Sequence, residues 1–253
     1  MRLPQYDDKH DADAHLTPDR MVRDRRLDVS IDPVPETVVL TYQPRFFDYV
    51  RTEEADGHLA EGFRYELLSL AGTDGRVGVV GSFGIGGPAT AVVVEQLATY
   101  GVERFCILGA SATLQPDVTG DHAVVVERAV RDEGTSHHYV EPARHASADP
   151  GLVAALEDAL AAHERPARTG TTWTTDAFFR ETVPEVEHYR DEGVLAVDME
   201  AATLFAIAQY RDLEAGALFA PFDCLTVDDW EARVEGREDR LESLVPVVRT
   251  AFA

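Results

Sequence analysis

Lysine is almost missing from this sequence. Lys9 is the only lysine among 253 residues, so arginine carries nearly all of the positive charge. Acidic residues number 46 against 23 basic ones, which gives a formal net charge of −23. This composition predicts a halophilic protein, because high salt screens the self-repulsion of an acidic surface. It also argues against a nucleic-acid-binding protein, since contacts to phosphates need clustered Lys and Arg.

Cysteine and long apolar segments are also scarce. Cys106 and Cys224 are the only cysteines, and each lies in an apolar stretch. Two cysteines cannot build a zinc cage alone, so we expect buried thiols and no metal. No apolar run approaches about 18 residues, and the first residues are charged rather than apolar. We therefore expect a cytoplasmic protein with no signal peptide and no membrane contact.

The 45% hydrophobic residues are spread evenly, which favours one large domain over two small ones. We expect a polar N-terminal arm over residues 1–33 and one domain over residues 34–253. Apolar runs predict strands, and helical spacing predicts helices between them. The predicted fold is a single-domain three-layer α/β/α sandwich with a mixed, mainly parallel central sheet. The expected strands are 37–42, 63–71, 76–81, 104–109, 122–128, 168–173, 194–197 and 216–222, and the expected helices are 46–52, 88–100, 151–163, 184–191, 200–211 and 243–252.

The arm carries a helix start and two histidines. Thr17 followed by Pro18 is typical of an N-cap and a first helical residue. His10 and His15 either reach a site, such as that of a neighbouring subunit, or are solvated surface histidines.

Residues 197–202 (VDMEAA) join a short strand to a long helix and place two carboxylates beside Met199. Ligands bind at the carboxyl ends of strands in open α/β sheets, and a buried carboxylate there is costly without a partner. The alternative is that Asp198 caps the helix and Glu200 occupies its first turn, where both are favourable.

Residues 81–89 (GSFGIGGPA) form a glycine turn between a strand and a helix. Gly84, Gly86 and Ala89 match the dinucleotide fingerprint, and Glu103 lies where an acidic ribose partner would. The turn does not follow the first strand, however, and Pro88 crowds it. A turn whose backbone N–H groups face a small anion or a sugar explains the same residues.

Residues 174–182 are expected to form a loop that offers aromatic side chains beside an arginine and two carboxylates. Phe178, Phe179 and Arg180 would cradle a planar heterocycle. Alternatively both phenylalanines belong to the core, and Arg180 and Glu181 are solvated. The pair His137 and His138 suggests a metal, but adjacent residues on a strand point to opposite faces and cannot share one ion.

Five segments in register resemble the nucleoside phosphorylase-I family, which includes uridine phosphorylase, hexameric purine nucleoside phosphorylase and methylthioadenosine/adenosylhomocysteine nucleosidase. The resemblance covers about residues 37–225, and it is greatest to the uridine phosphorylase-like branch. The segments are 84–89 (GIGGPA), Gly109 with 114–116 (LQP), 131–136 (RDEGTS), 175–179 (TDAFF) and 197–202 (VDMEAA).

The resemblance implies cleavage of a nucleoside's N-glycosidic bond by inorganic phosphate, giving free base and pentose 1-phosphate, with uridine favoured and a purine nucleoside as the other substrate. It implies no cofactor beyond phosphate as co-substrate, and a dimer-based or hexameric homo-oligomer. It assigns catalysis to Glu200, which grips the ribose hydroxyls, and to Asp223, which protonates the base. It assigns substrate binding to Phe178, Arg180, Asp198, Met199 and Glu200, and phosphate binding to Arg45, His58, Gly109, Ala110 and Ser111.

Several family positions differ here. Ile107 replaces the uridine phosphorylase arginine before Gly109, and His58, with Arg64 nearby, stands near the second phosphate arginine. Thr41 replaces the first phosphate-loop glycine, and Arg180 is the nearest substitute for the uracil-reading Gln-x-Arg. The sequence therefore leaves open a phosphate-independent nucleosidase of the same fold or a non-catalytic nucleoside-binding protein, with a nicotinamide enzyme as a more distant alternative.

Overall fold

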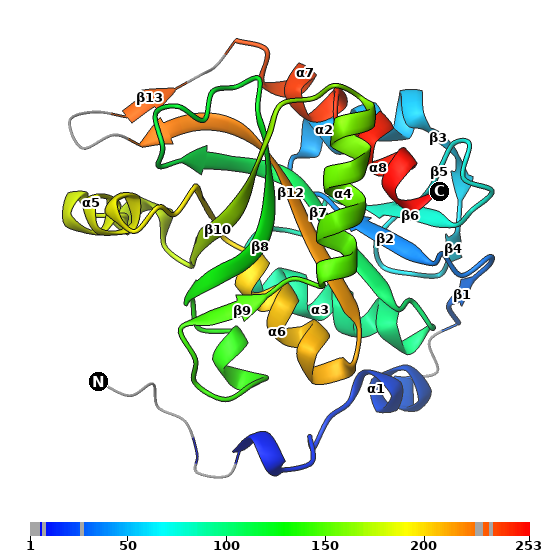
Figure 1. Cartoon of the computed structure of the whole chain (residues 1–253). Helices are drawn as coiled ribbons and strands as arrows, with labels where there is room; N and C mark the ends of the chain where they lie inside the picture. Colours follow the sequence, from blue (N-terminus) through cyan, green and yellow to red (C-terminus); the bar gives the residue numbers. More distant parts are fainter. Residues whose placement is uncertain (1–5, 7–8, 26–27, 226–229, 233–234) are drawn as a thin grey trace.

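A computed structural model describes residues 6, 9–25, 28–225, 230–232 and 235–253 (Figure 1). Its central sheet is mixed, with strand order β13-β12-β8-β10-β11-β7-β2-β6-β5-β3, and β9 pairs with β8. The strands of this sheet are β2 (Thr37–Leu40), β3 (Ala55–His58), β5 (Leu67–Leu70), β6 (Val77–Val80), β7 (Arg104–Thr113), β8 (Ala123–Asp132), β9 (His145–Ser147), β10 (Ala167–Thr175), β11 (Ala196–Asp198), β12 (Glu214–Leu225) and β13 (Trp230–Ala232).

Five of these strands close on one another. β12 pairs with β8 at one side and also runs parallel to β7 along most of its length. The ring β12-β8-β10-β11-β7 is therefore complete, while β2, β6, β5 and β3 extend the sheet as an open wing. Parallel pairing joins β7 to β12, β8 to β10 and β2 to both of its neighbours, which confirms the expected mixed sheet.

Helices cover both faces of the sheet, as the alternating pattern predicts. α3 (Gly87–Thr99) and α6 (Ala201–Arg211) pack together on one face, and α2 (Pro44–Tyr49), α4 (Pro150–Ala162) and α8 (Val245–Phe252) pack on the other (Figure 1). Each face has its own hydrophobic core cluster because the buried strands are apolar on both sides. The remaining α-helices are α1 (Pro18–Arg25), α5 (Val183–Asp191) and α7 (Arg237–Glu242), and four short helical turns are η1 (Lys9–Asp11), η2 (Val50–Glu54), η3 (Ser136–His138) and η4 (Phe178–Arg180).

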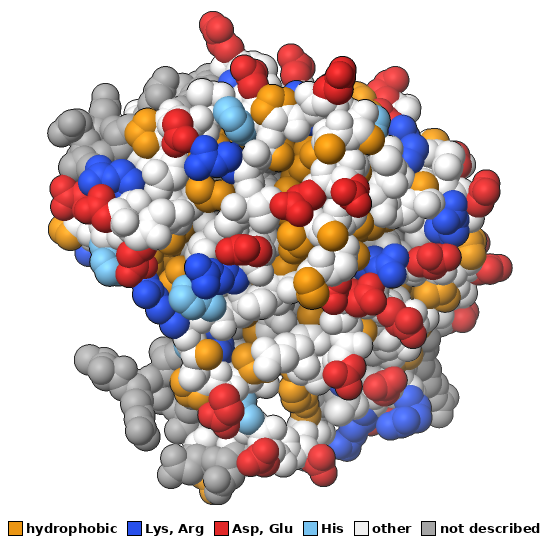
Figure 2. Space-filling model, viewed as in Figure 1, with side chains coloured by type: hydrophobic (Ala, Val, Ile, Leu, Met, Phe, Trp, Pro, Cys, Tyr) orange, Lys and Arg blue, Asp and Glu red, His pale blue; other side chains and the backbone are white. Residues whose placement is uncertain are grey.

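The N-terminal arm is tied to the rest of the chain by a small sheet, in which β1 (Ser30–Ile31) pairs antiparallel with β4 (Ala60–Glu61). The predicted cap of α1 is confirmed, since the Arg20 N–H donates to Thr17 Oγ1 at 3.2 Å. Figure 2 shows acidic side chains spread over the viewed face, with arginines interspersed among them. None of the described helices is long and apolar enough to cross a membrane.

The predicted ends of two strands and one predicted strand assignment were wrong. The small residues 110–113 continue β7 instead of forming a loop, because parallel pairing with β12 extends that far. Asp223 lies inside β12 rather than after it. His137 and His138 belong to the 3-10 turn η3, so the strand argument against a shared ion does not apply to them. The acidic sequence of residues 226–242 predicts a loop or an irregular helix; this segment falls partly outside the described residues, and its described part contains β13 and α7.

Gly87 sets how closely α3 approaches α6. A Cβ at this position would lie 2.5 Å from Thr203 Oγ1 and 2.9 Å from Thr135 Oγ1. Thr203 cannot easily turn away, because its hydroxyl donates to the buried carboxylate of Glu133 at 2.9 Å. The first turns of both helices are therefore held together only because residue 87 has no side chain.

We predict that Gly87→Ala lowers the free energy of unfolding by about 1–3 kcal/mol, the usual cost of overpacking. The gain in helix propensity, at most about 1 kcal/mol, does not offset this clash. Urea unfolding curves check it against Gly57→Ala, where a Cβ would meet nothing within 4 Å. Equal midpoints for the two variants would contradict the close approach.

Candidate active site

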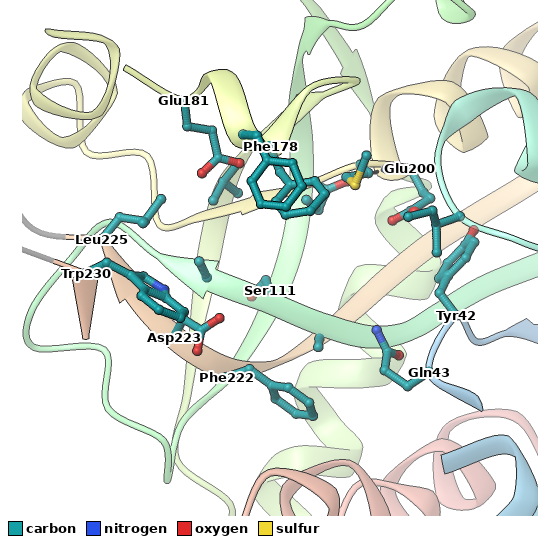
Figure 3. Close-up of a pocket in the computed structure, with 17 residues that line it drawn as sticks. Tyr42, Gln43, Ser111, Phe178, Glu181, Glu200, Phe222, Asp223, Leu225 and Trp230 are labelled. Carbon is teal, nitrogen blue, oxygen red and sulfur yellow. Dashed lines mark hydrogen bonds between the residues drawn. The ribbon is translucent and has the colours of Figure 1, made fainter. Parts of the chain in front are cut away.

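A cavity of about 590 Å³ opens where the carboxyl ends of several strands meet the glycine turn and η4. Figure 3 shows Glu200, Tyr42 and Gln43 at one end of it and Glu181, Leu225, Trp230 and Asp223 at the other. Phe178 lies above and Ser111 and Phe222 lie below, between the two ends. The cavity is thus an elongated slot with an acidic group at each end.

Glu200 is held at its end of the slot by the glycine turn. The Gly86 N–H donates to Glu200 Oε1 at 2.7 Å, and the residue is 7% exposed. Burial, and then the neighbouring charge of Asp198, raise the pKa of Glu200 to about 8. Gly86 itself has φ 84°, a conformation that favours glycine. The glycine turn therefore serves a protein carboxylate, and the N–H that a dinucleotide would need is already used.

Asp198 is buried beside Glu200, and its carboxylate accepts hydrogen bonds from neighbouring parts of the chain. It accepts hydrogen bonds from Thr172 Oγ1 at 2.7 Å and from the backbone N–H groups of Glu200 and Ala201, each at 2.7 Å. Burial raises its pKa, and these donors oppose that shift. Asp198 lines the cavity, but its contacts are those of a residue that fixes the start of α6. The capping interpretation thus describes its contacts well, and its substrate role stays a prediction.

The aromatic wall comes from η4. The rings of Phe178 and Phe179 lie 3.8 Å apart between centroids, and both line the cavity. Phe178 is 46% exposed and Phe179 87% exposed, so neither belongs to the core. Arg180 is exposed and does not line the cavity, whereas Glu181 does. The loop therefore presents aromatic faces and a carboxylate, not the expected arginine.

The predicted phosphate residues divide into two groups. Ala110 and Ser111 line the cavity, and the buried Ser111 Oγ has no hydrogen-bond partner among the described residues. Arg45 projects from the first turn of α2 to Glu238, 3.3 Å away, with 86% of its side chain exposed. His58 is exposed on the outer strand β3. Gly109 lies within β7 and faces Phe219 of β12. Within one chain these last three residues do not reach the cavity, and their phosphate roles stay predictions.

Asp223 lies at the end of the slot opposite Glu200, and its carboxylate is ion-paired with Arg237 of α7. Together with Glu181, Asp198 and Glu200 it gives the slot four carboxyl groups, and burial raises the pKa of the other three. Among the described residues that line it, none is a lysine, an arginine or a histidine. The slot suits an uncharged ligand that offers hydrogen-bond donors, and a phosphate group needs cations from elsewhere.

Sequence reasoning missed several members of the site. Tyr42 and Gln43 line the cavity directly after β2, shortly before Arg45 in the chain. The Tyr42 hydroxyl lies 2.8 Å from Thr90 Oγ1, and burial together with Glu200 raises the pKa of Tyr42. Nothing in the sequence around Thr172 indicates a role in the site, because that role depends on a hydrogen bond across the strand pair β10–β11.

The two arm histidines lie elsewhere in this chain. His10 contacts Glu141 Oε1 at 3.1 Å and the His137 carbonyl oxygen at 3.1 Å. Both histidines line a separate cavity between the arm and the end of α6. Their role in a neighbouring subunit's site stays a prediction. Among the described residues no group of three or more His, Cys, Asp and Glu could hold a metal ion.

We predict that Glu200→Gln changes how stability depends on pH. A carboxyl whose pKa rises from 4.5 to about 8 on folding is stabilising below pH 4.5, and this contribution is lost as pH rises to about 8. The glutamine variant lacks that loss. Its melting temperature relative to the unmodified protein should therefore increase between about pH 5 and pH 8 and level off above.

Scanning calorimetry across this pH range checks the effect, with Glu127→Gln at an exposed position as the matched control. The free-energy change should reach a few kcal/mol, because each pKa unit is worth about 1.4 kcal/mol. A difference between variant and parent that stays constant with pH would contradict the raised pKa.

Comparisons with known proteins agree with this architecture. A family model described as "Phosphorylase superfamily" matches residues 35–247. A guanosine phosphorylase from Halorubrum lacusprofundi is 32% identical over 199 residues, which are 78% of this chain and 82% of that protein. A uridine phosphorylase from Thermococcus kodakarensis is 34% identical over 156 residues, 56% of each chain. The crystal structure of uridine phosphorylase from Vibrio fischeri ES114 superposes with a TM-score of 0.73 at 20% identity, covering 88% of this chain and 95% of that one.

The family match spans most of the chain, and the solved structure confirms the mixed α/β fold expected from the sequence. The chain belongs to the phosphorylase superfamily.

Proposed function

We propose that this protein is a nucleoside phosphorylase, a pentosyltransferase that cleaves the N-glycosidic bond of a nucleoside with inorganic phosphate. The observation that carries the proposal is the slot itself, with the buried carboxylate of Glu200 at one end, Asp223 at the other and an aromatic wall between them. Relatives named guanosine phosphorylase and uridine phosphorylase support the same reaction.

In the proposed reaction the sugar lies at the Glu200 end and the base at the Asp223 end. Glu200 accepts hydrogen bonds from the ribose hydroxyls, and Met199 packs beneath the ring. A phosphate oxygen forms a bond to the anomeric carbon while the bond from that carbon to the base nitrogen breaks. The departing electron pair stays on the base, which takes a proton from the Asp223 carboxyl, and solvent returns a proton to Asp223 after the base leaves. Phe178 stacks on the base and holds it in line.

A second copy of the chain is part of the proposal. Ser111 and Ala110 give phosphate a neutral contact, but no lining side chain among the described residues supplies the positive charge that a dianion requires. We expect a homo-oligomer in which the neighbouring chain brings a cation to the slot. The acidic composition fits a cytoplasmic enzyme of a high-salt cell.

A hydrolase of the same fold is the second candidate, and it is favoured because none of the described lining residues is a cation. In that reaction a water oxygen, not a phosphate oxygen, bonds to the anomeric carbon, and the products are free pentose and base. Gln43 and Ser111 are neutral hydrogen-bonding groups suited to placing a water molecule.

We predict that turnover of a nucleoside panel (uridine, guanosine, inosine and adenosine) depends on phosphate and yields pentose 1-phosphate. The products are identified by mass spectrometry with and without phosphate. Equal turnover without phosphate, with free pentose as product, would replace the phosphorylase by the hydrolase. Binding of nucleosides with no bond cleavage under either condition would leave a nucleoside-binding protein.

We predict further that Glu200→Ala lowers kcat/KM by roughly 10²-fold or more, about 3 kcal/mol, because it removes hydrogen bonds that strengthen in the transition state. Initial rates with the preferred nucleoside check this, with Glu127→Ala as an exposed control that keeps the parent value. Unchanged turnover in a folded Glu200→Ala protein would reject the sugar site.

A further inference from the structure

The base end of the slot offers hydrogen-bond acceptors. Figure 3 shows the carboxylates of Glu181 and Asp223 on either side of this end, with Leu225 and Trp230 as its apolar walls. Asp223 is already ion-paired with Arg237. Glu181 is the carboxylate that remains for a ligand, since no described residue forms a hydrogen bond or an ion pair with its side chain.

The position of Glu181 is fixed by its neighbours. The Thr182 N–H donates to Glu185 Oε2 at 3.0 Å, and the Thr182 hydroxyl donates to the same oxygen at 2.6 Å. This capping box anchors the start of α5 directly after Glu181 and uses the carboxylate of Glu185. Arg180 is exposed and does not line the slot. Glu181 is thus the residue of this loop that turns a charged group into the slot.

The surroundings of Glu181 leave its charge without compensation. Burial, and then the nearby charge of Glu185, raise the pKa of Glu181 to about 7. The carboxylate is half-buried against the aromatic wall. A buried carboxylate without a partner is costly, and two N–H donors from a ligand would remove that cost.

Nucleobases differ in what they present to such a group. Guanine carries N1–H and the 2-amino group side by side, two parallel donors that match the two oxygens of a carboxylate. Hypoxanthine keeps only N1–H, and adenine has an acceptor at N1. Uracil places a carbonyl oxygen on each side of its single N–H, so both would face the carboxylate and repel it.

We propose that Glu181 is a specificity-determining residue that selects a guanine-type base, one with two adjacent N–H donors, over uracil and adenine. The proposal rests on the proposed function for the location of the base in the slot. It narrows the substrate from nucleosides in general to guanosine-like nucleosides.

The test compares binding and turnover of four nucleosides in the full-length protein. Titration calorimetry gives Kd, and initial rates in saturating phosphate give kcat/KM, for guanosine, inosine, adenosine and uridine. The expected order is guanosine, then inosine, then adenosine and uridine. Glu181→Gln should raise the Kd of guanosine and lower its kcat/KM, each roughly 10- to 100-fold, because the amide N–H₂ of glutamine then faces an N–H donor of the base. The Kd and kcat/KM of adenosine should improve.

Two further variants separate base recognition from a general effect on the fold. Glu181→Asp keeps the negative charge but moves it back by one methylene group. This variant should bind guanosine more weakly while keeping the order of preference among the four nucleosides. Glu187→Gln makes the same change on α5 outside the slot and should leave every ratio unchanged. Melting temperatures of all variants confirm folding.

The outcomes distinguish a failure of the base assignment from a failure of the proposed catalytic activity. Tight guanosine binding that depends on Glu181, without bond cleavage, supports the base assignment and overturns the catalytic proposal. Turnover with uridine preferred, or a guanosine preference that Glu181→Gln leaves intact, overturns the base assignment and leaves the catalytic proposal standing. A Glu181→Gln variant whose affinity for all four nucleosides falls by the same factor also overturns the base assignment.

Discussion

The buried carboxylate of Asp198 is the interaction on which the site depends. It ties β11, on which it stands, to β10 and to α6, since it accepts from the hydroxyl of a β10 threonine and from two N–H groups at the start of α6. Those N–H groups need partners at any helix start, and here the helix start is buried. The bond from Gly86 to Glu200 then ties the glycine turn to the same junction. A second buried carboxylate is therefore placed by the first.

The closed ring of strands explains why residues far apart in the sequence meet in one slot. β7, β11, β12 and β13 each contribute lining residues, and others come from the segments after β2 and β11, from the glycine turn and from η4 with the residue that follows it. Because the ring closes through the pairing of β12 with β7, Asp223 is carried to the same opening as Ser111. Gly87 allows α3 to approach α6 closely enough to complete the Glu200 end.

The order and type of the elements could be predicted from the sequence, because apolar runs and glycine turns alternate regularly along it. Glu200, Met199, Phe178 and Asp223 could be found because each stands at a strand end or in a family motif. Arg45 and Arg180 were chosen for their charge, but the direction of each side chain depends on the first turn of α2 or on η4. Side-chain direction is set by packing between elements, so the sequence places Glu181 in the same loop without showing that it, and not Arg180, lines the slot.

The sign of the charge in the slot bears on how products leave. A nucleoside arrives uncharged, so the four carboxylates neither attract nor hinder it over long distances. Pentose 1-phosphate is a dianion, formed inside an acidic slot of a chain with a net charge of −23. For a phosphorolytic reaction the field of the protein therefore repels the incoming phosphate and the outgoing sugar phosphate alike. High salt shortens the reach of that repulsion to the slot itself, where screening by solvent ions is least effective.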